Sequence, residues 1–133
     1  MLILLIAIAL VGAAALIIVL KYTGENSKSE PTIDEVLDVS VDVNDITTNL
    51  GSNDYIRISF KIQTDSKKAK KELEKRDFQV RNIIIQTLSE KTAEELEGKE
   101  GKEKLEEDLK NQIDEIMQEG NIVRVYITDS LLQ

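Results

Sequence analysis

The side chains that most often perform catalysis or hold metals are scarce or absent in this sequence. It contains no His and no Cys, which excludes imidazole bases, thiolate nucleophiles and the usual zinc ligands. Asp and Glu are plentiful, but no pair of carboxylates is singled out for hydrolysis, and no glycine-rich phosphate loop is present. We therefore expect no catalytic residues, no cofactor and no metal site, and we predict that the protein is not an enzyme.

Two clusters of charge could instead bind a partner. The first is basic and comprises Lys67, Lys68, Lys70 and Lys71. These lysines could contact anionic lipid headgroups or an acidic protein, or they could form ordinary surface ion pairs with Glu72 and Glu74 at i,i+4 spacing. The second cluster is an acidic run over residues 94–108, which is typical of a solvated helix face.

The balance of charge argues against binding to nucleic acid. The 133-residue chain has 17 Lys and Arg against 25 Asp and Glu, a net charge of −8, and all of these residues lie at or after Lys21. A nucleic-acid interface needs a basic face for the phosphates, and single-strand binding adds aromatic side chains for stacking. Only 4% of the residues are aromatic, so we expect no nucleic-acid partner.

The first twenty residues have the composition of a membrane-spanning helix. Residues 2–20 include no charged residue and no proline. At about 1.5 Å rise per residue this stretch spans roughly 28 Å, close to the ~30 Å hydrocarbon thickness of a bilayer. A cleaved secretory signal is the alternative, but its apolar region is usually about 7–15 residues long and follows a basic start. We therefore predict an uncleaved transmembrane helix over residues 1–20, in contact with membrane lipid.

Small side chains lie near one face of this predicted span. Ala9, Gly12 and Ala13 would let a second helix approach closely, although such residues are also common in membrane helices generally. The span carries no ionisable residue of the kind that lines proton or ion paths. Lys21 and Lys28 follow it, which by the positive-inside rule alone favours a cytoplasmic position for the rest of the chain.

A polar stretch separates the predicted span from the rest of the chain. Residues 21–35 include the only proline, and we interpret them as a flexible juxtamembrane linker in which Tyr22 anchors the end of the span at the membrane interface. Residues 36–133 are long enough to enclose one core, so we predict a single soluble α/β domain there.

Three strands are predicted in this domain. Apolar and polar residues alternate over residues 37–44, 56–63 and 123–128, as expected of strands with one buried face. Turn-forming residues 51–54 lie between the first two strands and predict a hairpin.

Two main helices are predicted between the second and third strands. The first follows the capping residue Ser66, and its apolar stripe consists of Leu73, Val80, Ile84 and Leu88, widened by Phe78, Ile83 and Ile85. The second presents one apolar face over residues 105–117 and stops at Gly120. Each element has a single apolar side, so we predict an α+β fold in which a small sheet carries its helices on one face.

Several short segments follow one another in the order typical of a known family. They are residues 48–50, 55–58, 81–85, 87–89, 95–96, 125–128 and 131–133. With the apolar span and polar linker, they make the chain resemble the FliL family, the flagellar basal body-associated proteins of bacteria, over nearly its whole length. The sequence departs from that pattern at Asp114, where Asn is expected, and at Ser130, where an aromatic residue is usual.

The resemblance implies both a fold and a function. The domain would lie outside the cytoplasmic membrane, adopt a stomatin/prohibitin (SPFH-like) fold and form homo-oligomeric rings. The protein would associate with the flagellar stator proteins MotA and MotB and support motility, torque and chemotaxis. We therefore expect a non-enzymatic, single-pass inner-membrane protein that braces or encircles the stator. The alternative is a general stomatin-type membrane-organising protein with no flagellar role. The residues that bind a partner are not predicted.

Overall fold

The computed structural model describes residues 1–26 and 29–133, with side chains described outside residues 19–28. The chain divides into two units, Met1–Pro31 and Thr32–Gln133. All buried hydrophobic side chains of the described residues belong to the second unit. Because the second unit encloses its own core, it is a self-contained folding unit.

The first unit contains a single helix, α1 (Leu2–Asn26). Its uninterrupted run of Leu, Ile and Ala favours helix, and the helix continues through the first part of the predicted linker. The side chains of Lys21, Tyr22 and Lys28 lie outside the described residues. Within the part of the chain that the structure describes, no helix is both long and apolar enough for a membrane span.

A short helix, α2 (Ile33–Asp38), opens the second unit. The amide of Glu35 donates a hydrogen bond to the hydroxyl of Thr32 at 3.2 Å, which caps the helix. Asp34 and Glu35 place negative charge at the positive end of the helix dipole. These local interactions override the strand-like alternation, so the strand predicted over residues 37–44 begins later than expected and the end of the predicted linker is helical.

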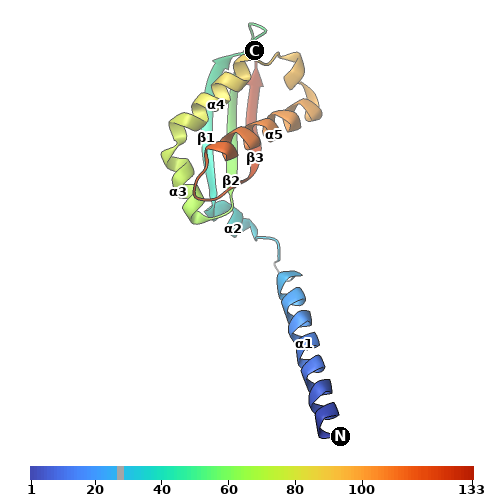
Figure 1. Ribbon diagram of the computed structural model, residues 1–133. Helices are drawn as coiled ribbons and strands as arrows, with labels where there is room; N and C mark the ends of the chain where they lie inside the picture. The colour runs from blue at the N-terminus through green and yellow to red at the C-terminus, as the bar shows by residue number, and fades with distance from the viewer. Residues whose placement is uncertain (27–28) are drawn as a thin grey trace. The chain divides into compact units, whose positions relative to one another are not determined.

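Three antiparallel strands form one sheet in the order β1-β2-β3 (Figure 1). Their bounds are β1 (Ser40–Asn49), β2 (Tyr55–Thr64) and β3 (Ile122–Leu132). The amide of Leu50 donates to the carbonyl of Asp54 at 2.8 Å and closes the turn between the first two strands. The predicted hairpin is therefore confirmed.

The apolar positions of β2 are also confirmed, because Ile56, Ile58, Phe60 and Ile62 are all buried. The predicted polar face is wrong at two positions, because Ser59 and Gln63 are buried as well. The alternation predicted for the third strand is wrong at its start. Ile122 and Val125 are buried, whereas Val123 is 44% exposed. The pairing between β2 and β3 is irregular here and skips Val123, which moves the buried positions out of strict alternation.

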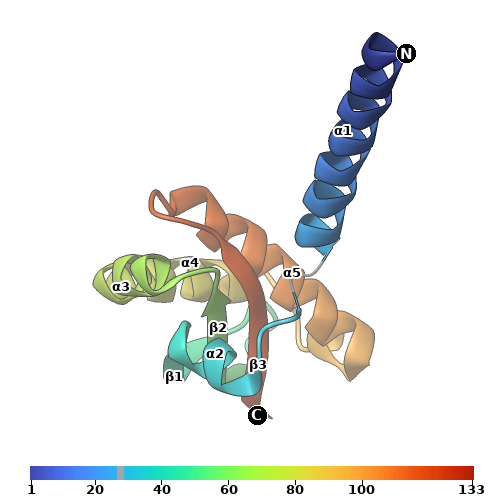
Figure 2. The same ribbon diagram turned by 90° about the horizontal axis from the view of Figure 1, so that it is seen from below.

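Four helical segments connect β2 to β3. They are α3 (Lys67–Lys75), α4 (Asp77–Ser89), the 3₁₀ turn η1 (Glu94–Leu96) and α5 (Gly98–Ile116). Figure 2 shows α4 and α5 on the same side of the sheet, where α4 packs on β1 and α5 on β3. The shared core includes Val43, Ile58, Phe60, Ile62, Leu73, Val80, Ile84, Leu88, Leu105, Leu109 and Ile113. The predicted α+β architecture, a small sheet with its helices on one face, is confirmed, and the sheet is antiparallel.

The first predicted helix is broken in two. Arg76 ends α3 with φ −91° and ψ 14°, and α4 begins at the next residue. On α4 the buried positions Val80, Ile84 and Leu88 recur every four residues. Phe78 and Ile85 lie off this stripe and are 71% and 41% exposed, so their predicted places in it are wrong.

Candidate functional site

The predicted basic cluster lies on α3, close to the start of the second unit. The hydroxyl of Ser66 accepts a hydrogen bond from the amide of Ala69 at 3.0 Å, so the lysines begin at a capped helix end. Thr64 donates its hydroxyl proton to the carbonyl oxygens of Val39, at 2.7 Å, and Ser66, at 2.9 Å. Because Val39 directly follows α2, the start of α3 lies at the end of the domain where α2 is found (Figure 1).

Ordinary i,i+4 ion pairing does not account for this cluster. Lys68 pairs with Glu119 at 2.8 Å, and this hydrogen bond and charge raise the pKa of Lys68. Glu72 pairs with Arg76 at 2.8 Å. Among the described residues, the remaining lysines of α3 have no carboxylate within ion-pair distance; these are Lys67, Lys70, Lys71 and Lys75. Their positive charge is therefore available to a partner.

The Glu72 carboxylate fastens the loop between α5 and β3 to α3. It accepts hydrogen bonds from the amides of Gln118, at 2.9 and 3.0 Å, and Glu119, at 2.7 Å. Burial raises the pKa of Glu72, but the hydrogen bonds from the Glu119 amide and from Arg76 outweigh it and hold this pKa below its ordinary value. The carboxylate thus acts as a structural clamp beside the lysines.

Two adjoining hollows meet at Phe78 and Gln79. One, of about 450 Å³, is also lined by Asn82, Ile83 and Ile116. The other, of about 480 Å³, is also lined by Lys68, Lys71, Glu72, Lys75, Arg76, Gln118 and Glu119. An exposed aromatic ring thus lies beside several positive charges, an arrangement suited to an anionic partner with an apolar portion.

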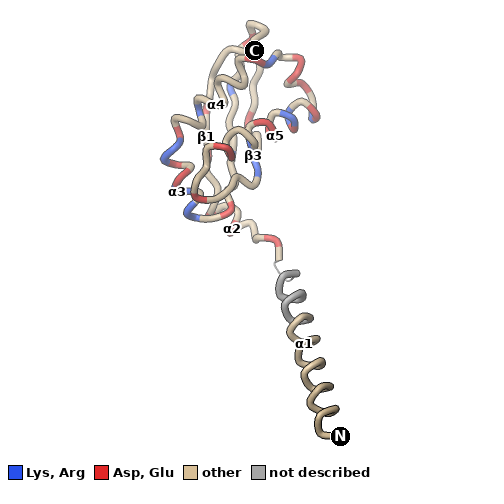
Figure 3. Tube along the Cα trace, viewed as in Figure 1, with Lys and Arg blue, Asp and Glu red and all other residues tan. Residues whose placement is uncertain are grey.

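The acidic run forms most of η1 and the first half of α5 (Figure 3). Most of its carboxylates are exposed, which confirms a solvated face, and Lys99 pairs with Glu103 at 3.8 Å. Glu106 has a second role, because its Oε2 accepts a hydrogen bond from the Ile127 amide at 2.8 Å. Asp114, farther along α5, does the same for the Ile122 amide at 2.8 Å.

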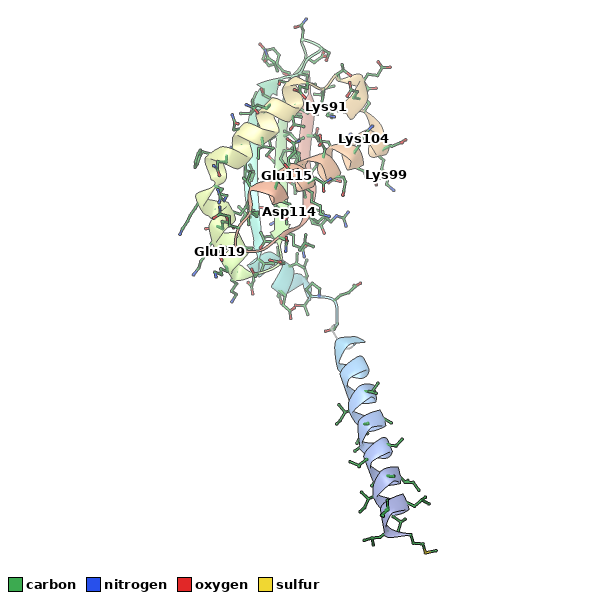
Figure 4. The ribbon with its side chains drawn as sticks, in the orientation of Figure 1. Lys91, Lys99, Lys104, Asp114, Glu115 and Glu119 are labelled. Carbon is green, nitrogen blue, oxygen red and sulfur yellow. The ribbon has the colours of Figure 1, made fainter. Side chains whose placement is uncertain are left out.

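These two contacts to β3 were not found from the sequence. They join residues on a helix to backbone amides of a strand, and no local spacing signals such a pairing. In Figure 4, Asp114 lies near the C-terminal end of α5, whereas Lys99 and Lys104 lie toward its N-terminal end. Within the described residues, no three acidic side chains are arranged to hold a metal ion.

The small residues of the N-terminal segment lie on α1. Ala9, Gly12 and Ala13 are exposed, and a Cβ atom added to Gly12 would meet no atom within 4 Å. The face is therefore open to another helix, and its use in helix packing stays a prediction.

Comparison with known proteins decides the family. The family model described as "Flagellar basal body-associated protein FliL" matches residues 40–133, from the first residue of β1 to Gln133. The chain belongs to the FliL family. The predicted family is thus confirmed, and the protein is associated with the flagellar basal body. The helices α1 and α2 precede the matched region.

Two curated relatives carry the same name. The flagellar protein FliL of Bacillus subtilis (strain 168) is 48% identical over 122 residues, which cover 92% of this chain and 86% of the relative. The flagellar protein FliL of Aquifex aeolicus (strain VF5) is 32% identical over 79 residues, which cover 59% of this chain and 49% of the relative. The first similarity extends beyond the family match and includes part of the N-terminal unit.

Proposed function

We propose that this FliL chain is a non-enzymatic scaffold of the flagellar basal body. A transmembrane helix over residues 1–20 tethers it to the inner membrane, and an SPFH-like domain lies on the extracytoplasmic side. Homo-oligomeric rings of this domain brace or encircle the MotA/MotB stator and thereby support torque, motility and chemotaxis.

The match to the FliL family over residues 40–133 is the observation that carries this proposal. The membrane tether rests on residues 2–20, whose uninterrupted apolar sequence is about as long as a bilayer core is thick. Because this segment has no ionisable side chain, it suits an accessory of an ion-conducting complex better than a conductor.

The N-terminal helix supports a scaffold that assembles from copies. On α1, the open face at Ala9, Gly12 and Ala13 offers a place for a neighbouring helix.

Motility of a deletion strain tests the proposal. We expect the strain to swim poorly in viscous medium and to recruit fewer fluorescently tagged stator units to each motor. The complete chain should restore both properties, whereas residues 32–133 alone should not, because they lack the tether. Swimming and stator recruitment equal to those of the parent strain would remove the proposed function.

A pull-down distinguishes this function from a general stomatin-type role in organising the membrane. Solubilised complete chain should recover MotA and MotB from membranes of motile cells. Recovery of other membrane proteins with no stator subunit would favour the stomatin-type role.

A further inference from the structure

We propose that α3 binds anionic phospholipid headgroups through the four lysines Lys67, Lys70, Lys71 and Lys75. Phe78 lies beside two of them, Lys71 and Lys75. This inference rests on the proposed function in one respect, namely that residues 1–20 hold the chain in a membrane. It adds a second contact with the same membrane, made by the folded domain.

The first support is that these lysines have no counter-charge of their own. Among the described side chains, none of the four has a carboxylate within ion-pair distance, whereas the neighbouring Lys68 is already paired with Glu119. Lys67 and Lys70 lie in the first turn of α3, where a positive charge opposes the helix dipole. The position of these two lysines therefore costs helix stability unless an external anion compensates it.

The second support is their place in the domain. The hydrogen bonds of Thr64 join Val39, which follows α2, to Ser66, which caps α3. The lysine helix thus starts where the chain leaves the first unit. About twelve residues connect residue 20 to Thr32, and even a fully extended chain of that length reaches only ~40–43 Å. A membrane-embedded α1 keeps this end of the domain at a high local concentration near the lipid surface.

The third support is the exposed aromatic ring. Phe78 is 71% exposed and lines the same hollow as Lys71 and Lys75. Aromatic side chains favour the interface between headgroups and acyl chains, and lysines beside them reach the phosphates. An acidic protein segment would satisfy the charges too, but only the lipid is always within reach of the tether.

Acidic side chains limit the contact to α3. Asp34, Glu35 and Asp38 on α2 and Glu74 on α3 would be repelled by an anionic surface, and the whole chain carries a net charge of −8. We therefore expect weak binding that depends on the tether and is abolished by salt, since the Debye length falls to ~3 Å at 1 M.

The test uses single cysteines in the complete chain, which has none of its own. An environment-sensitive fluorophore is attached at Glu74→Cys on α3, with Glu90→Cys after α4 as the matched control. The chain is placed in nanodiscs of phosphatidylcholine, with or without an equal part of phosphatidylglycerol. The fluorescence emission maximum of the Glu74→Cys probe should shift to the blue only when phosphatidylglycerol is present. In ~1 M salt the emission maximum should return to its value in pure phosphatidylcholine. The Glu90→Cys probe should not shift.

Charge reversal identifies the lysines that are responsible. Changing Lys67, Lys70, Lys71 and Lys75 to Glu should abolish the shift, since each lysine near an anionic surface is worth about fivefold in affinity. The same reversal of Lys99, Lys102, Lys104 and Lys110 on α5 changes the net charge equally and should leave the shift intact. Glu near the start of α3 suits the helix dipole, so the first variant is expected to fold, which circular dichroism checks.

Three results would overturn the proposal. They are a shift in pure phosphatidylcholine of the same size, a shift that survives reversal of the α3 lysines, and a shift that appears only when an acidic protein partner is added. If the complete chain does not enter nanodiscs, the proposed tether is wrong. Residues 32–133 that carry the Glu74→Cys fluorophore are then held by an N-terminal histidine tag on vesicles that contain nickel-chelating lipid, which supplies the missing tether. Absence of a blue shift when these vesicles contain phosphatidylglycerol contradicts the lipid contact.

Discussion

Asp114 is predicted to join the end of α5 to the start of β3 through its oxygen atom and not through its charge. Its Oδ1 accepts a hydrogen bond from the Ile122 amide at 2.8 Å, and Ile122 is 3% exposed. Asp114→Ala leaves this shielded N–H unpaired, which costs about 1–3 kcal/mol of unfolding free energy. Asp114→Asn keeps an acceptor and removes a negative charge from the last turn of α5, where such a charge is unfavourable by ~0.3–1 kcal/mol.

Urea unfolding of residues 32–133, followed by far-UV circular dichroism at neutral pH, measures both variants. With a slope of about 1–3 kcal/mol per molar urea, the alanine variant should unfold roughly 1 M earlier than the parent. The asparagine variant should unfold within about 0.5 M of the parent, on either side. Equal losses in both variants would show that the charge matters, and no loss in either would show that the hydrogen bond does not contribute.

Three further predictions concern the core and the clamp of the domain. Ile84→Ala should cost about 2–5 kcal/mol in urea unfolding, because Ile84 is fully buried between helices and sheet. A Cβ atom at Gly101 would collide with the Glu95 carbonyl oxygen, so Gly101→Ala should lower the free energy of unfolding by about 1–3 kcal/mol, seen as a lower melting temperature. As a control, Gly12→Ala should not alter the fold of α1, because a Cβ atom there meets no atom within 4 Å. The folded-state pKa of Glu72 is lowered, so its stabilisation is complete above about pH 4.3 and is lost as pH falls through the folded-state pKa. The difference in melting temperature between the parent and Glu72→Gln should therefore shrink in acid, and a difference independent of pH would contradict the clamp.

Local periodicity was enough to predict the main elements of the domain. The apolar positions of β2, the turn after Leu50 and the apolar stripe of α5 all depend on neighbours a few residues apart, and the structure confirms them. The family resemblance rested on short segments in the same elements, and the family match confirms it.

The errors arose where the backbone departs from regular geometry. The pairing of β3 skips Val123, which shifts the buried positions of that strand. A break at Arg76 placed Phe78 outside the core. Each departure shifts the periodic pattern of apolar residues by one position. The pattern in the sequence does not show where such a shift occurs.

The candidate surface depended on contacts between distant residues. Glu72 was expected to pair with a lysine of its own helix, yet it binds the amides of Gln118 and Glu119, 46 and 47 residues away. That long-range contact, together with the Lys68–Glu119 pair, decides which lysines of α3 remain available. Sequence spacing indicates only the partners within α3. The partners in the loop between α5 and β3 become visible only in the tertiary fold.

The most direct test of the account is the position of Gln133 relative to the membrane in living cells. The positive-inside rule applied to Lys21 and Lys28 favours the cytoplasm, whereas the stator-bracing scaffold requires the opposite side. Gln133→Cys introduces the only thiol of the chain, which a membrane-impermeant maleimide can reach only from outside the inner membrane. The account predicts labelling in intact cells and recovery of the labelled chain in the membrane fraction. Labelling that requires cell lysis, or a labelled chain found free of membranes, would contradict it.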